Sequence, residues 1–188
     1  SIRRRQRQMC IRDSHNTYRG SKEALKNAKT IISKTKCDAV KLEGGKKVAQ
    51  IIKTLVKNKI PVMGHLGVLP QSAKNFRFKG KNTTEQNKIL SEAKLLESSG
   101  VFSIVLECVE SSLAKKITEK INIPTLGIGA SSNCDGQVLV TDDLIGLNPI
   151  NLRFVKKYSN ISKEITKAVS NYSKDVRKKK FPLKKHSY

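Results

Sequence analysis

Residues 38–45 read DAVKLEGG, a short apolar and β-branched stretch that ends in charged residues and glycines. The pattern returns in PVMGHLG at residues 61–67 and in IVLEC at residues 104–108. Strands of a parallel sheet are buried on both faces, so they are apolar runs rather than alternating ones. Polar residues at their carboxyl ends are typical of the active-site face of a parallel α/β barrel, which predicts an enzyme. Four side chains fall at these ends: Lys41, Glu43, His65 and Glu107.

Helical spacing of apolar residues separates the strands. Ser21 is the expected N-cap of a first helix, whose apolar face extends to Ile32. A later helix carries Ile89 to Leu96 and stops at Gly100. The same spacing predicts helices near residues 48–56, 111–120 and 161–176, and strands at 38–42, 60–64, 101–107, 124–129 and 136–140.

This strand–helix alternation predicts an α/β fold with a parallel sheet. Right-handed crossovers then place all the strand carboxyl ends on one side of the sheet. The chain of 188 residues shows five strands. A complete (β/α)8 barrel has eight strands and about 250 residues, so we expect only part of one.

The formal net charge of +23 raises the alternative of a basic nucleic-acid-binding protein. The lysines are, however, spread over the polar faces of every predicted helix, and only residues 177–180 and 184–185 form local clusters. Such runs are usually solvated helix ends or tails. We therefore expect no nucleic-acid partner.

Cysteine spacing and hydropathy exclude further classes. The four cysteines form no CxxC pair, which argues against a zinc cage or a disulfide framework. No apolar run reaches the roughly 20 residues that span a bilayer, and no stretch has the apolar core of a signal peptide. We expect a cytoplasmic location and no membrane partner.

Residues 1–14 differ in character from the rest of the chain: they are arginine-rich and lack apolar periodicity. Met9 to Ser14, MCIRDS, can be back-translated as ATG TGT ATA AGA GAC AGN, which matches the end of a common transposase adapter. Our hypothesis is that residues 1–14 are an adapter-derived leader; the alternative is a genuine, disordered basic arm. Residues 15–188 are then the carboxyl-terminal part of a single barrel domain.

The chemistry available at the strand ends depends on residue type. Lys41 and Glu43 lie two residues apart on a strand and so project from the same face. The lysine suits a substrate carboxylate and the glutamate suits Mg²⁺, although an internal salt bridge is the alternative. Glu107 ends an apolar strand, a setting that suits a general base; the alternative is an exposed strand-end carboxylate.

His65 lies between Gly64 and the pair Leu66-Gly67, and these glycines allow the backbone to approach a ligand closely. A single histidine without a second one at ligand spacing does not indicate a metal site. Taken alone, His65 is as often a core residue as a functional one.

Five segments together resemble ketopantoate hydroxymethyltransferase, in that family's order and close to its spacing. They are VKLEGG (40–45), PVMGHLGVLPQS (61–72), VLECV (105–109), IPTLGIGA (123–130) and CDGQVLV (134–140). The resemblance covers residues 15–188, about the last two-thirds of the family's length. It implies a (β/α)8 TIM barrel of the phosphoenolpyruvate-mutase type, here only about its last five strands, and often a decamer when full length.

By the same resemblance, the reaction transfers a hydroxymethyl group from 5,10-methylenetetrahydrofolate to 3-methyl-2-oxobutanoate. The product is 2-dehydropantoate, on the route to pantothenate. Glu107 matches the family's proton acceptor, Lys41 a substrate-binding lysine and Glu43 a glutamate associated with Mg²⁺. His65 matches a histidine near the metal, which we assign to substrate binding.

The chain also departs from the family. Two metal-binding aspartates, in segments resembling DSLG and DLPF, have no counterpart, so we expect this chain alone to be inactive. The loop at residues 75–81 is shortened, and Ser131-Ser132 replaces a glycine that commonly follows GIGA. A carbon–carbon lyase of the same superfamily is a further alternative, but its cysteine-bearing loop is not evident.

Overall fold

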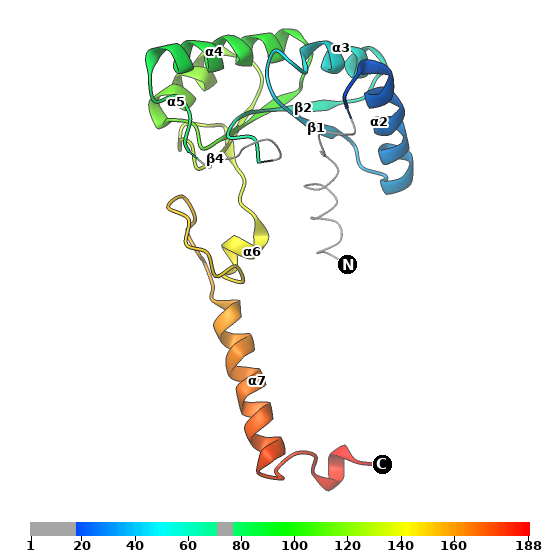
Figure 1. Cartoon of the computed structure of the whole chain (residues 1–188), viewed down its shortest axis with the longest axis vertical. Helices are drawn as coiled ribbons and strands as arrows, with labels where there is room; N and C mark the ends of the chain where they lie inside the picture. Colours follow the sequence, from blue (N-terminus) through cyan, green and yellow to red (C-terminus); the bar gives the residue numbers. More distant parts are fainter. Residues whose placement is uncertain (1–17, 71–76) are drawn as a thin grey trace. The chain divides into compact units, whose positions relative to one another are not determined.

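The computed structural model describes residues 18–70 and 77–188 (Figure 1). The predicted leader, residues 1–14, and the segment 71–76, which includes Gln71 and Ser72, lie outside the described residues. The chain consists of two compact units, residues 1–138 and residues 139–188. That residues 15–188 form a single domain therefore stays a prediction.

The first unit is built on a five-stranded parallel sheet in the order β1-β2-β3-β4-β5. Strand order follows chain order, as successive strand–helix–strand units require. This confirms the predicted parallel α/β fold and its five strands. The strands are β1 (Val40–Glu43), β2 (Val62–Gly67), β3 (Ser103–Glu107), β4 (Thr125–Ile128) and β5 (Gly136–Gln137).

Four helices alternate with these strands, and Figure 1 shows α3, α4 and α5 together on one side of the sheet. Helix α4 contacts β2 and β3 and also packs against α3 and α5. Their side chains and those of the sheet form one hydrophobic core. The helices are α2 (Ser21–Thr35), α3 (Ala49–Lys57), α4 (Thr83–Ser98) and α5 (Ser111–Lys120).

The pleat separates core residues from the candidate site residues. Leu42, Val62 and Ile104 are buried in the core beneath the helices. Successive side chains of a strand point to opposite faces, so the residues directly before and after these core residues project from the other face of the sheet. That second face carries Lys41 and Glu43 at the end of β1, and the sheet thereby sorts apolar from reactive side chains.

Two local predictions are corrected. Ser21 is not an N-cap: Gly20 holds that position, without a side-chain cap, and Ser21 is already the first residue of α2. The strand predicted at 136–140 has only two residues, since it pairs with β4 only through Gly136 and Gln137. The chain then turns into a short helix that the sequence did not predict, α6 (Thr141–Leu144).

In the second unit, helix α7 (Ile161–Arg177) confirms the predicted carboxyl-terminal helix, which is followed by a 3-10 turn, η1 (Lys184–His186). No residue of α7 is buried, although its apolar residues share one face. The Phe181 ring contacts Tyr172 and His186, with ring centroids 5.6 and 5.3 Å apart. Within the described ranges, no helix combines the length and apolarity needed to cross a bilayer.

Gly67 gives a test of the sheet's geometry. Its φ of 101° is unfavourable for other residues, and a Cβ there would lie 2.1 Å from the Glu107 carbonyl oxygen. We expect Gly67→Ala to lower the free energy of unfolding by about 2 kcal/mol or more. Gly20→Ala, in open space with φ of −153°, serves as the control and should change it by less than about 1 kcal/mol. Equal effects in urea unfolding would contradict this account.

Candidate active site

Parallel pairing brings the predicted site residues to one edge of the sheet. Glu43 of β1 pairs in register with His65 of β2, and Gly67 of β2 pairs with Glu107 of β3. His65 therefore lies between two strands that each end in a glutamate. Three residues far apart in sequence become neighbours because the strands are parallel and adjacent.

The His65 ring is completely buried and faces a carboxylate on each side. Its Nε2 atom lies 3.2 Å from Glu107 Oε2, and its Nδ1 atom lies 3.6 Å from Glu43 Oε1. Neither ring nitrogen meets hydrogen-bond geometry. The two contacts become ion pairs when the imidazole is protonated. Active-site hydrogen bonds are often long without substrate and tighten when it binds.

The two carboxylates favour a protonated imidazole. Burial lowers the pKa of His65, while the contacts with Glu107 and Glu43 raise it and the nearby positive charge of Lys41 lowers it. The net result is a pKa raised above the ordinary 6.5. A doubly protonated ring can donate from both nitrogens, which is the form that suits carboxylates on both sides.

Lys41 completes the group of predicted residues. It lies half-buried on β1, two residues before Glu43, and therefore on the same face of the sheet. Its effect on His65 shows that its charge acts within this cluster. Glu43 and Glu107 are the last residues of β1 and β3, whereas Lys41 and His65 lie two residues before the ends of β1 and β2. Glu107 is partly exposed.

Backbone hydrogen bonds hold the strands that carry this cluster. The sequence motifs predicted the residues involved but not these bonds. The Gly44 N–H donates to the His65 carbonyl at 3.0 Å, with the glycine at φ of 125°. The Val68 N–H donates to the Glu107 carbonyl at 2.8 Å. Cys108 follows Glu107 with φ of 49°, and burial together with the Glu107 charge raises the pKa of its thiol. The glycines and the cysteine were visible in the motifs, but their contacts were not.

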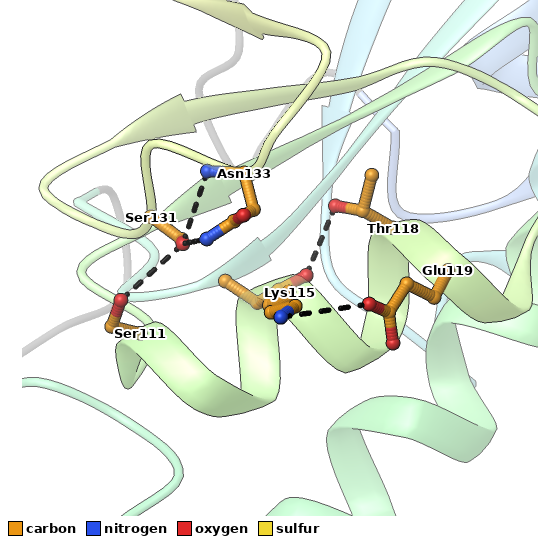
Figure 2. A network of polar contacts seen from close by, with 7 residues as sticks. Ser111, Lys115, Thr118, Glu119, Ser131 and Asn133 are labelled. Atoms are coloured by element: carbon orange, nitrogen blue, oxygen red, sulfur yellow. Dashed lines mark hydrogen bonds and ion pairs between the residues drawn. The ribbon is translucent and has the colours of Figure 1, made fainter.

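Ser131, in the loop after β4, has a defined structural role (Figure 2). Its Oγ accepts hydrogen bonds from the backbone N–H and the side-chain amide of Asn133, at 3.2 and 3.1 Å. Ser111 at the start of α5 donates to the same oxygen at 3.3 Å. Ser131 therefore links the loop after β4 to the start of α5 by hydrogen bonds.

The described residues do not form a complete metal site. In residues 18–70 and 77–188, no three histidine, cysteine, aspartate or glutamate side chains are placed to hold one metal ion. Glu43 is a buried carboxylate and has the hard oxygen donors that Mg²⁺ prefers. The residues present therefore offer one ligand for Mg²⁺ and do not make a site by themselves.

The fold is a parallel α/β sheet, and a buried imidazole lies between two carboxylates near the carboxyl ends of its strands. These features are typical of α/β enzymes whose active sites lie at the carboxyl edge of a parallel sheet. The sequence profile described as ketopantoate hydroxymethyltransferase matches residues 2–184, a range that includes most of the predicted leader. The chain belongs to this family.

Two curated relatives carry the name 3-methyl-2-oxobutanoate hydroxymethyltransferase. The protein from Pelagibacter ubique is 72% identical over 180 residues, which cover 96% of this chain and 70% of the relative. The protein from Rhizobium etli is 46% identical, over 92% of this chain and 65% of the relative. The chain thus spans about two-thirds of the length of these relatives.

Among solved structures, one chain of the Amycolatopsis orientalis BexX/CysO complex is similar to this chain. The match covers 58% of this chain and 43% of that one. The sequence identity is 14% and the TM-score is 0.40. A likeness at this level carries no argument about fold or function. The family assignment rests on the sequence relatives alone.

Titration of His65 tests the cluster in metal-free buffer. A histidine whose folded pKa is raised stabilises the fold fully below its unfolded value of 6.5 and loses that contribution as the pH rises through the folded value. The stability difference between wild type and His65→Gln should therefore shrink as the pH rises above 6.5.

The direct measurement is the NMR titration of the imidazole signal that disappears in His65→Gln. We expect its midpoint above 6.5. A midpoint below that value would show that burial outweighs the two carboxylates, and the stability difference would then grow with rising pH. His186→Gln, at an exposed position, is the control for the assignment of the signals.

Proposed function

We propose that this site takes part in transfer of a hydroxymethyl group from 5,10-methylenetetrahydrofolate to 3-methyl-2-oxobutanoate, giving 2-dehydropantoate. One observation carries the proposal. His65 of β2 contacts Glu43 and Glu107, the last residues of β1 and β3, in a chain 72% identical to a relative named for this transfer. The substrate and co-substrate come from the relatives' name and from the family resemblance.

Glu107 is the proposed proton acceptor. It is partly exposed at the end of β3 and can meet the C3 proton of the keto acid. Removal of that proton leaves an enolate. Hydrolysis breaks both bonds from the methylene carbon to the folate nitrogens and gives formaldehyde, and C3 of the enolate adds to its carbonyl carbon while the resulting alkoxide takes up a proton. Water supplies the hydroxyl group of the transferred unit, and tetrahydrofolate is released.

Lys41 and His65 have supporting roles in this proposal. Lys41 is a cation at the same edge of the sheet and suits the substrate carboxylate. His65 orients the Glu107 carboxylate through its Nε2 atom and adds positive charge where the enolate forms. The cluster thus combines a base, a carboxylate anchor and an electrostatic partner for the oxyanion.

Mg²⁺ is part of the proposal, with Glu43 as one ligand and the others supplied from outside the described residues. The bound ion would stabilise the enolate as a Lewis acid. A test independent of turnover is isothermal titration of Mg²⁺, in the presence of 3-methyl-2-oxobutanoate, into a chimera in which this chain replaces the aligned residues of the Pelagibacter ubique relative. We infer that Glu43→Gln weakens this binding.

We further propose small-molecule substrates, a cytoplasmic location and assembly with copies of the same chain, and no nucleic-acid or membrane partner. The exposed apolar side chains along α7, at Ile165, Val169, Tyr172 and Val176, support self-association. By the family resemblance, we propose that the full-length protein assembles as a decamer.

Turnover gives the main test. The 188-residue chain by itself should form no 2-dehydropantoate, because two aspartates that the family resemblance assigns to the metal have no counterpart in it. A chimera in which this chain replaces the aligned 180 residues of the Pelagibacter ubique relative should be active, since by the family resemblance we expect the rest of that protein to supply the missing aspartates. In the chimera, Lys41→Met should raise KM for the keto acid by about tenfold or more, through loss of a charge-assisted hydrogen bond.

Lys94→Met, at an exposed position of α4, is the matched control and should leave KM unchanged. Turnover by the isolated chain would contradict the need for the missing ligands. A correctly folded chimera without activity would contradict the proposed function. Steeply salt-dependent DNA binding without keto-acid binding would favour the nucleic-acid alternative.

A further inference from the structure

A segment after β2 returns to the immediate neighbourhood of Glu107. The Lys79 N–H donates to the Cys108 carbonyl at 2.8 Å, and the Glu110 N–H donates to the Lys79 carbonyl at 2.8 Å. Lys79 thereby forms a parallel bridge with Val109, two residues beyond Glu107. This places Arg77-Phe78-Lys79, here named the rim segment, beside the exit of β3.

Helices α4 and α5 hold the end of the rim segment in place. Glu85 Oε2 accepts from the N–H groups of Gly80 and Lys81, at 2.8 and 3.1 Å. Gln86 Nε2 donates to the Gly80 carbonyl at 3.0 Å, and a Cβ on Gly80 would lie 2.6 Å from Leu113. Backbone hydrogen bonds therefore hold the chain from Lys79 to Lys81, directly after Phe78.

The side chains of the rim segment are not used by these contacts. Arg77 is exposed, Lys79 is half-buried, and the Phe78 ring is 48% exposed. An exposed aromatic ring can stack against the ring of a ligand, and cations that flank it in sequence can attract the ligand's anionic groups. Lysine is abundant throughout the chain, but there are only five phenylalanines, so Phe78 is the distinctive member.

The two cations lie near one acidic group. The pKa of Glu85 is lowered overall: burial raises it, whereas the N–H groups of Lys81 and Gly80 and the charges of Lys79 and Arg77 lower it. Glu85 offsets one of the two positive charges and is already occupied by two backbone donors. A net positive charge remains beside the aromatic ring.

We propose that the rim segment binds the p-aminobenzoylglutamate portion of the reduced folate co-substrate, an inference that rests on the proposed function. This portion of the folate is a flat aryl ring followed by a glutamate with two carboxylates. The aryl ring matches the Phe78 face, and the carboxylates match Arg77 and Lys79. Binding there would hold the folate beside Glu107, where its methylene carbon must meet C3 of the keto acid.

The test titrates the 188-residue chain with p-aminobenzoyl-L-glutamate and with p-aminobenzoate, followed by NMR. The glutamate-bearing probe should bind more tightly, and added salt should weaken it. Arg77→Gln/Lys79→Gln should weaken its binding by roughly tenfold, since two ionic contacts are lost. Phe78→Leu, which keeps the apolar volume, should weaken it by about fivefold through loss of ring stacking.

Lys88→Gln/Lys94→Gln is the matched control, because it removes the same two charges from exposed positions of α4. This variant should bind the probe like wild type, and circular dichroism should show that all variants are folded. In the chimera with the Pelagibacter ubique relative, binding of 3-methyl-2-oxobutanoate with Mg²⁺ should be unchanged in every variant, since none alters the carboxylate–imidazole cluster.

Tetrahydrofolate itself separates the two possible failures. If wild type binds tetrahydrofolate and both rim variants bind it equally well, the rim segment is not its site and the proposed function stands. If wild type binds neither tetrahydrofolate nor the glutamate-bearing probe, the folate part of the proposed function fails and this inference with it. If the α4 control weakens binding as much as the rim variants, attraction is only by overall charge, and the inference is overturned.

Discussion

The contact of the buried His65 ring with two carboxylates is the constraint on which the rest of the site depends. An imidazole removed from water needs partners for its nitrogens, and Glu43 and Glu107 face them. Their positions require β2 to lie between β1 and β3 in one register. A slip of one residue would turn His65 to the helix side and bring core side chains to the site.

The sheet meets this constraint by a division between its two faces. Helices α3 and α4 cover one face, where Val62 and Ile104 are completely buried. The other face carries charged side chains at the strand ends, and burial makes their mutual contacts stronger than in water. The close approach of Gly67 to the Glu107 carbonyl leaves no room for a side chain between β2 and β3, and Gly44 adopts a φ of 125° as it bonds to the His65 carbonyl. Stability and chemistry therefore come from opposite faces of the same strands.

Much of this arrangement can be predicted from sequence pattern because apolar period and chain order determine parallel strand–helix units. Helix α5 agrees with the predicted 111–120, and the four site residues were visible as polar ends of apolar strands. The two-sided contact of His65 was not predictable, since it depends on the register between strands. The Ser21 cap, the length of β5 and helix α6 were missed, because they depend on local hydrogen bonds that composition does not reveal.

The chemical roles of the site residues were less predictable from the sequence than their positions. Spacing alone allowed a salt bridge for Lys41 and Glu43 or an exposed carboxylate for Glu107, and the family resemblance supplied the specific roles. The structure adds the neighbours of each group, and it gives Ser131, a departure from the family pattern, a place in a hydrogen-bonded loop. The central claim that remains is the proton transfer by Glu107.

Hydrogen–deuterium exchange at C3 of 3-methyl-2-oxobutanoate tests that claim most directly, because it reports enolate formation without any folate. Measured by proton NMR in D₂O with Mg²⁺ on the chimera with the Pelagibacter ubique relative, the exchange should be slowed about 10³-fold by Glu107→Gln. Glu110→Gln, at the nearby N-cap of α5, should leave it unchanged. Exchange that persists at the wild-type rate in Glu107→Gln would show that another group takes the proton.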